Sequence, residues 1–268
     1  MRGWVEPRDG LLPRETTSNG CFETMRAYRG RIFRLDAHLE RLYASAAYLG
    51  VLAPSDRHHL ARQLCGALAS SGIREAVVRI ALMPQTHGVP VPSIVVQPAQ
   101  RLPASAYRRG IRVAIAPTRK FAVSTVDAQA KYSARLGSVL AVMDAQLRGA
   151  DEALWMDAMG YVTESTASNF GIVRDGAILT PPCWLGLLAG ITRDVLFKLA
   201  EDLRLPIRAL PLTRHDAYNA HEAFLTSTLK EILAVTTIDG RRIGHGRPGP
   251  VTQRLHRAFR QLVEREIG

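Results

Sequence analysis

The 268-residue sequence predicts an α+β protein with two domains, the second built on a sheet that curls into a barrel. The first half alternates strand-like apolar runs with segments of helical periodicity, and the second half combines short strands and tight turns with a few helices. Between the halves, the polar stretch 117–125 interrupts the strand pattern and is typical of a linker. We therefore expect an N-terminal domain over residues 1–117, a linker over 118–125 and a C-terminal domain over 126–268.

The first half begins with two expected strands, 21–28 and 31–35, joined across the hairpin signal Arg29-Gly30. A helix is expected to start at Asp36 as its cap and to end at Gly50, because its apolar residues recur at helical spacing. A second helix is expected over 55–70. Strands are then expected over 76–83, 93–97 and 111–116.

The second half opens with an expected helix over 134–147, whose apolar side contains Leu136, Val139, Leu140 and Met143. Tight turns are expected at 157–160, 174–176 and 239–240 because of their Asp and Gly residues. Helices over 192–203 and 251–266 interrupt the strands, and the glycines at 244 and 246 predict a turn before the last helix.

The composition excludes several classes of protein. A hydrophobic fraction of 47% is enough for a real core, yet no apolar run approaches the roughly 18 residues of a membrane span. The segment Met1–Pro7 lacks the apolar stretch of a signal peptide. The three cysteines are far apart, which favours neither a disulfide framework nor a metal site. We therefore expect a cytoplasmic protein that binds no membrane and no metal.

The formal charge of +11 raises the question of a nucleic-acid partner. The arginines are scattered from Arg2 to Arg265 with no run longer than two, whereas nucleic-acid modules show a clustered basic stripe or a reading motif. The charge is better explained by a compositional bias together with attraction of small anions. We expect no nucleic-acid partner.

Lysine is rare in this chain, with four residues (Lys120, Lys131, Lys198 and Lys230) against 31 arginines. Lysine can be desolvated and used as a nucleophile, whereas arginine keeps its proton. Lys131 lies upstream of the polar segment Tyr161–Phe170, which contains the carboxylate of Glu164. This combination favours amine chemistry, with a solvated lysine at the start of a helix as the plain alternative.

Six segments in order along the chain resemble the motifs of one family. They are Phe33–Leu42, Lys131 with Leu136–Ala141, Thr163–Asn169, Gly190–Val195, Thr226–Glu231 and Gly244–Thr252. Together they resemble the class IV pyridoxal-phosphate aminotransferases of fold type IV, which include branched-chain and D-amino-acid aminotransferases and 4-amino-4-deoxychorismate lyase. The resemblance covers about residues 18–260. It implies a smaller N-terminal α/β sandwich, a larger C-terminal pseudo-barrel and a homodimer.

The resemblance also implies roles for individual residues. Lys131 is the expected partner of the cofactor's aldehyde, as an imine, and the expected carrier of the substrate's α-proton. Glu164 is expected to keep the pyridine nitrogen protonated, and its alternative is a solvated turn residue. Arg41 is the expected phosphate cation, with His38 orienting it, and its alternative partner is Glu40. The remaining expected cofactor contacts are Ser168, Asn169, Ile191, Thr192, Thr228 and Leu229, although Thr192 also fits an ordinary helix cap.

Departures from the family's patterns bear on the substrate. Leu136 stands where branched-chain enzymes usually place a tyrosine, five positions after the lysine, and in this it resembles the D-amino-acid and lyase branches. Residues 82–84 occupy the region of the D-amino-acid enzymes' Arg-x-His carboxylate trap. Phe22, Arg79 and Ser227 are the candidate substrate contacts. Arg79 is the candidate partner of the substrate carboxylate, and its alternative is an arginine on a strand that faces solvent.

The sequence therefore predicts an aminotransferase that moves an amino group between an amino acid and a 2-oxo acid. It leaves the donor and its stereochemistry open. The alternatives are 4-amino-4-deoxychorismate lyase, which releases pyruvate and 4-aminobenzoate, and a non-enzymatic, basic nucleic-acid-binding protein.

Overall fold

The computed structural model describes residues 20–85, 88–100 and 102–268, and Met1–Pro7 lies outside them. The chain forms two compact units. Unit 1 comprises Met1–Arg101 as far as described, Ala130–Leu136 and Val263–Gly268, and unit 2 comprises Leu102–Gln129 and Gly137–Leu262. The boundaries of these units differ from those of the expected domains. In particular, Ala130–Leu136 belongs to unit 1, because the segment around Lys131 pairs with the first strand of that unit.

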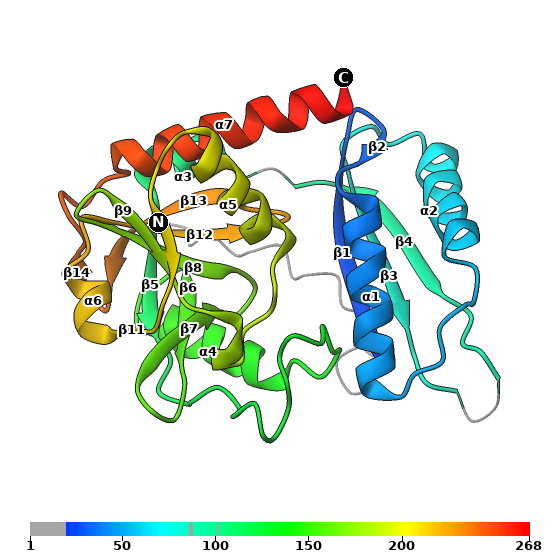
Figure 1. The fold of residues 1–268 in the computed structure, drawn as a ribbon, viewed down its shortest axis with the longest axis horizontal. Coiled ribbons are helices and arrows are strands. Elements are labelled where there is room, and N and C mark those ends of the chain that lie inside the picture. The colour runs from blue at the N-terminus through cyan, green and yellow to red at the C-terminus, as the bar shows by residue number, and fades with distance from the viewer. Residues whose placement is uncertain (1–19, 86–87, 101) are drawn as a thin grey trace. The chain divides into compact units, whose positions relative to one another are not determined.

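Unit 1 is an antiparallel sheet with two helices on one face (Figure 1). Its strand order is β2-β1-β3-β4. The strands are β1 (Cys21–Tyr28), β2 (Arg31–Ile32), β3 (Ala76–Leu82) and β4 (Ser93–Pro98), and the helices are α1 (Leu35–Leu49) and α2 (Arg57–Ser71). The hairpin at Arg29-Gly30 is confirmed by the pairing of Tyr28 with Arg31.

Side-chain alternation along β1 decides what faces the helices of unit 1. Cys21, Met25 and Ala27 join the core formed with Leu39 and Leu42 of α1, among others. Glu23 has the same parity and is also fully buried, so a carboxylate points toward the helical layer.

The two helix starts in unit 1 differ in how they are capped. The expectation that Asp36 caps α1 is wrong, because the cap is Arg34 in the left-handed region at φ 56° and Asp36 lies inside the first turn. Helix α2 begins with a side-chain cap, because Asp56 accepts a hydrogen bond from the His59 N–H at 2.8 Å.

Unit 2 is built on a sheet of ten strands that closes on itself. The pairs β8–β12, β12–β13, β13–β5, β5–β6, β6–β7 and β7–β8 form a ring, so the expected barrel is confirmed. The strands are β5 (Ile111–Ile115), β6 (Glu152–Met156), β7 (Tyr161–Ser165), β8 (Asn169–Arg174), β9 (Ala177–Thr180), β10 (Ile207–Ala209), β11 (Leu212–Thr213), β12 (Glu222–Ser227), β13 (Glu231–Ile238) and β14 (Arg241–Arg242).

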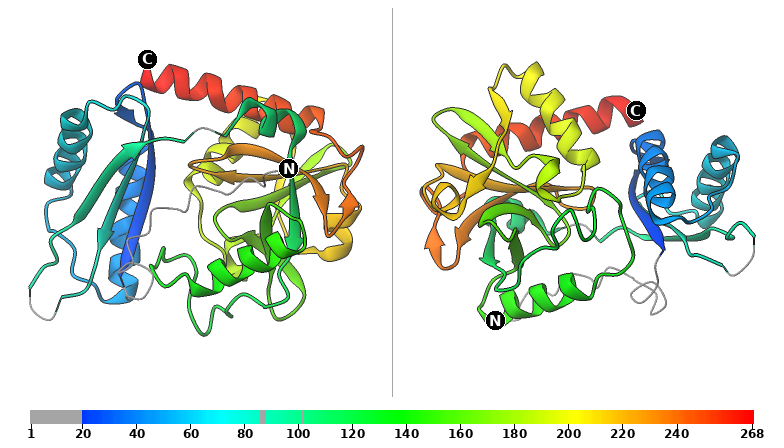
Figure 2. Two further views of the ribbon diagram at one scale, coloured as in Figure 1. Left: turned by 180° about the vertical axis from the view of Figure 1, so that it is seen from behind. Right: turned by 60° about the horizontal axis from the view of Figure 1, so that its bottom comes forward.

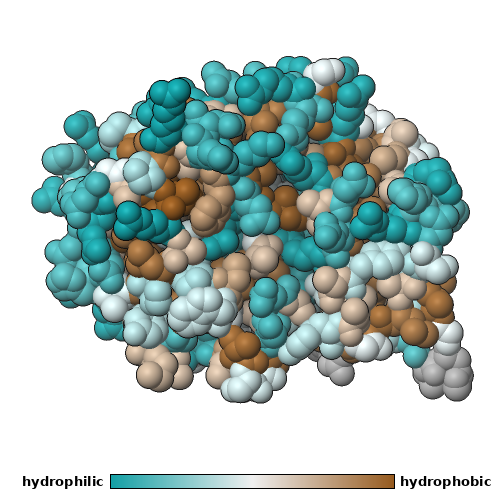
Figure 3. Space-filling model, viewed as in Figure 1, coloured by the Kyte–Doolittle hydropathy of each residue, from teal (hydrophilic) through white to brown (hydrophobic). Residues whose placement is uncertain are grey.

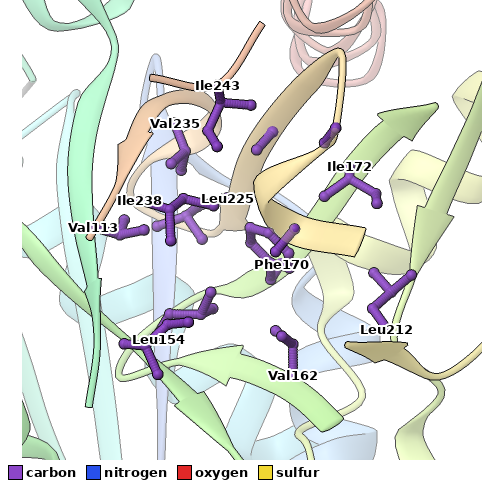
Figure 4. Packing of buried hydrophobic residues seen from close by; sticks show 14 of the residues in the cluster. Val113, Leu154, Val162, Phe170, Ile172, Leu212, Leu225, Val235, Ile238 and Ile243 are labelled. Carbon is purple, nitrogen blue, oxygen red and sulfur yellow. The ribbon is translucent and has the colours of Figure 1, made fainter. Parts of the chain in front are cut away.

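Apolar side chains from many of these strands fill the inside of the barrel (Figure 4). Leu154, Phe170, Ile172 and Leu225 are buried there to within 1% of full burial, from strands far apart in the sequence. The expected turns at 157–160, 174–176 and 239–240 connect neighbouring strands. The core therefore makes the barrel a rigid frame for residues at the strand ends.

Helices pack around the barrel in unit 2 (Figure 2). They are α3 (Ala104–Arg109), α4 (Leu136–Leu147), η1 (Cys183–Leu185), α5 (Ile191–Asp202), α6 (Arg214–Tyr218) and α7 (Pro250–Ile267), the last of which ends in residues of unit 1. Among the described residues, no helix has both the length and the apolar character of a membrane-spanning segment.

Helix α4 has its apolar side outward rather than toward its own chain. Leu140 is 55% exposed and Met143 54%, whereas Ala141 and Ala145 are buried against Trp155. The sequence predicts the stripe correctly, but the small residues on the other side of the helix make the contact with the barrel.

Candidate functional site

Lys131 lies in an extended segment of unit 1, five residues before α4 begins. Its backbone N–H donates to Ser45 Oγ at 2.9 Å, and its carbonyl accepts from the Phe22 N–H at 3.1 Å. Tyr132, the next residue, forms a bridge with Cys21 of β1. Lys131 therefore does not open a helix. Contacts with the sheet and with α1 fix its main chain, and this fixes the position from which its side chain extends.

Within unit 1, the amine of Lys131 and the guanidinium of Arg79 each lie against the ring of Phe22. The Lys131 Nζ is 4.7 Å from the centroid of the Phe22 ring, and the Arg79 guanidinium carbon is 5.4 Å from it. Phe22 is 3% exposed and Arg79 6%. The alternative of a solvent-facing arginine on β3 is therefore wrong, and Arg79 and Lys131 share Phe22 as a neighbour.

Arg41 is held by a buried carboxylate. Its Nε and Nη2 donate to the two oxygens of Glu23 at 2.6 and 2.9 Å, which is the fork geometry of a strong guanidinium–carboxylate pair. The carboxylate that holds Arg41 is thus Glu23 rather than the expected alternative, Glu40. Glu23 lies on β1 and Arg41 on α1, so the pair also connects the sheet to the helical layer.

His38 acts on Arg41 through Glu23. Its Nδ1 lies 2.8 Å from the second Glu23 oxygen. Burial would raise the pKa of Glu23, but Arg41 and His38 outweigh it and hold that pKa well below its usual range. Burial lowers the pKa of His38, against the opposing effect of Glu23. His38 is thus a neutral ring whose Nδ1–H donates to an ionised carboxylate.

Glu164 lies on β7 of unit 2 and is 7% exposed, so the interpretation as a solvated turn residue is wrong. Its Oε1 forms an ion pair with Lys120. Its Oε2 accepts from Asn169 Nδ2 at 3.2 Å and from the Leu188 N–H at 3.1 Å. Three polar groups of unit 2 thereby fix one carboxylate, and its Oε1 has room for a further donor.

The turn between β7 and β8 sets this geometry. Glu164 and Asn169 are direct partners across the two strands, so their side chains share a face. The turn is closed by the Ser165 N–H donating to the Ser168 carbonyl at 2.8 Å. A Cβ added at Gly190 would lie 1.9 Å from Asn169 Oδ1, so glycine is required for the chain to pass this amide.

Several donors near this turn have no partner inside the described chain. The hydroxyl oxygens of Ser168 and Thr226 are buried without a hydrogen bond there. Ile191 and Thr192 form the first turn of α5, where backbone N–H groups have no acceptor within the helix, and both are buried. Helix α5 packs against β12, the strand that carries Thr226.

The turn after β12 contains the other expected cofactor contacts. Thr228 and Leu229 lie in it, partly exposed, and Ser227 Oγ accepts from the Lys230 N–H at 3.2 Å. The Ser227 hydroxyl is therefore engaged within its own turn.

A buried ion pair ties this turn to the one after β7. Lys230 Nζ donates to Glu152 Oε2 at 2.6 Å, and Thr166 Oγ1 donates to Glu152 Oε1 at 2.5 Å. Lys230 is 7% exposed and Glu152 1%. Glu152 thus contacts residues of both turns that carry expected cofactor contacts.

Sequence reasoning missed the structural roles of Glu23, Lys120 and Glu152. Each had a signal: Glu23 interrupts an apolar strand, Glu152 begins another, and Lys120 is one of only four lysines. A charge within a buried strand needs a partner. The partners, however, come from distant segments, so the pairs are visible only in the folded chain.

A comparison with protein families decides the classification. Residues 20–238 match the family model described as amino-transferase class IV. The chain is a class IV aminotransferase.

Relatives of this class IV aminotransferase support the assignment over most of its length. It is 35% identical to a putative branched-chain-amino-acid aminotransferase of Methanocaldococcus jannaschii over 253 residues, which is 91% of this chain and 87% of the relative. It is 33% identical to the branched-chain-amino-acid aminotransferase of Pseudomonas aeruginosa, with 91% and 84% covered. The D-alanine aminotransferase of Listeria monocytogenes is 30% identical, with 93% and 89% covered.

Solved structures agree on the fold. A branched-chain amino acid aminotransferase crystallised with pyridoxamine 5'-phosphate superposes with a TM-score of 0.88 at 30% identity, covering 97% of this chain and 91% of that one. The Escherichia coli enzyme gives 0.86 at 29%, covering 91% and 85%. These findings favour the aminotransferase over the lyase and over a protein without enzymatic activity.

Class IV aminotransferases use pyridoxal phosphate, and the residues of this chain fit that cofactor. A phosphate needs donors, and the unpartnered hydroxyls of Ser168 and Thr226 together with the first turn of α5 supply them. A pyridine N–H needs a buried acceptor, which is what Glu164 offers.

Proposed function

We propose that the chain transfers the amino group of a branched-chain L-amino acid to a 2-oxo acid, with Lys131 as the lysine that binds pyridoxal phosphate covalently. The observation that carries the proposal is the fixed main chain of Lys131, with its amine over the Phe22 ring that Arg79 also contacts. When bound, the cofactor withdraws electrons from the substrate's α-carbon. The Nζ of Lys131 removes the proton at that carbon when the donor reacts and returns a proton to the same carbon when the 2-oxo acid is aminated.

Glu164 is the proposed acceptor for the pyridine N–H. It is buried and ionic, and its ion pair with Lys120 supports the charged form of the carboxylate. The contacts from Asn169 and Leu188 orient its second oxygen, and the first, which also pairs with Lys120, is the proposed acceptor for the ring N–H. Lys120 is therefore a proposed positioning residue.

Arg41 is the proposed cation for the cofactor's phosphate, with Ser168, Ile191, Thr192, Thr228 and Leu229 as the proposed donors and neighbours. The geometry of Arg41 supports this role, because Glu23 holds one edge of the guanidinium and so keeps its charge in a fixed place.

For the substrate, Arg79 is the proposed partner of the α-carboxylate, and the Phe22 ring is the proposed wall for an apolar side chain. A buried cation at the ring that the Lys131 amine also contacts suits a carboxylate, and an aromatic face suits a branched aliphatic group. The branched-chain relatives from Methanocaldococcus jannaschii and Pseudomonas aeruginosa support this donor class.

The half-reaction tests the proposed function directly. Holoenzyme mixed with leucine, isoleucine or valine, with no 2-oxo acid present, should release about one equivalent of the matching 2-oxo acid per bound cofactor. D-alanine, tested in parallel, should react at least about 100-fold more slowly than these donors. Faster reaction with D-alanine would contradict the donor assignment, and no 2-oxo acid from any donor would contradict the function.

The carboxylate behind Arg41 gives a first mutational prediction. Glu23→Gln should weaken pyridoxal-phosphate affinity about tenfold, because a neutral amide holds the guanidinium less firmly than a carboxylate does. Titration of the apoenzyme by absorbance measures this. The control is Glu40→Gln, which neutralises an exposed neighbour of Arg41 on the same helix. Equal cofactor affinity of the two variants would contradict the role of Glu23.

We also propose a homodimer that contacts through α4, and a cytoplasmic location. The exposed apolar residues of α4 recur at helical spacing, so they form one stripe: Leu136, Val139, Leu140, Met143 and Leu147. The left view of Figure 2 shows α4 nearest the viewer, whereas Figure 3 shows the opposite face, on which hydrophobic residues are scattered among hydrophilic ones. The resemblance to dimeric family members supports the dimer. The free thiols of Cys21, Cys65 and Cys183 are typical of a reducing compartment.

The dimer proposal predicts that Leu140→Glu with Met143→Glu shifts the protein to the monomer. Two charges in an apolar contact should raise the dimer dissociation constant at least about 100-fold, and glutamate keeps the helix intact. Sedimentation equilibrium measures the change. The control is Leu52→Glu, at an exposed leucine outside α4. A double variant that stays as dimeric as the control would exclude this stripe as the contact.

A further inference from the structure

Unit 2 contains a cavity of about 880 Å³ that is lined by arginines. We call it the arginine cavity. The strand β5 and the segment after it, the end of α4, helix α6 and the β13–β14 turn form its walls. Glu164, Lys120, Thr192 and Thr228 are not among its lining residues, so it is a separate place from the proposed cofactor contacts. Its arginines are Arg112, Arg119, Arg148, Arg214 and Arg241.

The positive charges of the arginine cavity exceed its negative charges. Asp239 is the one carboxylate in its lining. Arg112 pairs with Asp151 at 3.2 Å outside the lining, and Arg148 pairs with Asp144 at 2.7 Å. In the described part of the chain, Arg119, Arg214 and Arg241 form no ion pair with a carboxylate.

Asp239 offsets one of the five positive charges, and its oxygens are already engaged. Its Oδ1 accepts from the Ile115 N–H at 2.8 Å and pairs with Arg148 at 3.4 Å, and its Oδ2 accepts from the Tyr218 hydroxyl at 2.7 Å. Burial, followed by this hydrogen bond, raises the pKa of Tyr218 to about 12, so the hydroxyl keeps its proton. Asp239 therefore connects groups that line the cavity.

Two arginines of the cavity, Arg148 and Arg241, are held in place by neighbouring groups of the wall. Arg148 Nη2 donates to the Ile115 carbonyl at 2.6 Å, and the Arg241 guanidinium lies 4.5 Å from the centroid of the Tyr218 ring. Among the described residues, Arg214 donates a hydrogen bond to a weak acceptor, the Met156 sulfur at 3.6 Å. Like charges that line one cavity repel, and an anion bound among them reduces that repulsion.

From this arrangement we infer that the arginine cavity binds a small molecule with two or more phosphate charges, through Arg119, Arg214 and Arg241. Guanidinium groups match phosphate oxygens with paired hydrogen bonds. The volume is in the range of small-molecule sites, about 300–1,000 Å³, and far exceeds what a single inorganic phosphate fills. A diphosphate, either inorganic or part of a nucleotide, is the ligand chemistry that fits both the charge and the space.

The test uses holoenzyme, so that the cofactor's own phosphate contacts are already filled. Inorganic pyrophosphate and ADP are titrated by calorimetry, each at constant ionic strength set with sodium chloride. Saturable binding of one or both at a single site per chain is expected. The tighter of the two identifies whether the free or the nucleotide-borne diphosphate is the source.

Variants decide whether the arginine cavity is the place. Arg119→Gln with Arg214→Gln should weaken binding of the diphosphate about 100-fold, on the basis of about tenfold for each guanidinium that no longer bonds to the phosphate oxygens. Arg208→Gln removes an exposed arginine of β10 in the same unit and should leave binding unchanged. No saturable binding of either probe, or equal binding by the double variant and the control, overturns the inference. Neither result bears on transamination, which is measured separately.

Discussion

Lys131→Ala should lower kcat for transamination by about 10⁴-fold or more. The variant loses both the amine that binds the cofactor covalently and the base that moves the α-proton, and the second role alone is worth up to about 10⁴-fold. The fold should be kept, because the hydrogen bonds of Lys131 with Ser45 and Phe22 use its main chain, although its amine loses the contact with the Phe22 ring. Steady-state kinetics with a branched-chain donor measure the decrease.

Lys198→Ala is the matched control for this prediction. It removes an exposed lysine from α5, and alanine is an excellent helix former. Its kcat should equal that of the wild type. If Lys131→Ala kept more than about one hundredth of the wild-type kcat, general acid–base catalysis by this residue would be contradicted.

Lys230→Met should destabilise the protein by about 3–5 kcal/mol, because it leaves the carboxylate of Glu152 buried without its cation. The partner change Glu152→Leu should cost a similar amount. The double variant should recover most of this stability, since two apolar side chains of similar size fill the same space. Denaturant unfolding of the three variants measures these values.

The same pair has an expected pH dependence. Burial by itself would raise the pKa of Glu152, but Lys230 and the hydrogen bonds from Thr166 and Ala153 lower it below its usual value. A lowered pKa gives stability that is present above the unfolded value of 4.5 and is lost as the pH falls toward the folded value. The double variant should lack this contribution. Equal stability of the single and double variants would contradict the coupling of the two residues.

The arrangement of the chain's elements was largely predictable from its sequence. Strands 21–28 and 76–83 and the two helices between them in the sequence follow from apolar periodicity. Turn residues mark the strand ends of the barrel. The outward face of α4 was not predictable, because an apolar stripe looks the same whether it faces its own core or a partner. Only the buried Ala141 and Ala145 on the other side distinguish the two cases.

The residues of the candidate site also fall into those that the sequence predicts and those that it does not. Lys131, Glu164 and Arg41 are recognisable because each lies in a local motif. The groups that orient two of them are not, because Glu23 and Arg41 are 18 residues apart and Lys120 and Glu164 are 44 apart. Hydrogen-bond partners at such separations are set by the strand register, which the sequence specifies only through the completed fold.

The central claim, that Lys131 is the lysine joined to the cofactor, can be measured by peptide mapping. Borohydride reduction of the holoenzyme makes the link permanent, and digestion followed by mass spectrometry locates it among four lysines. The pyridoxyl group should be found on the peptide that contains Lys131. A label on Lys120, Lys198 or Lys230, or on no peptide of a protein that carries cofactor, would contradict the account.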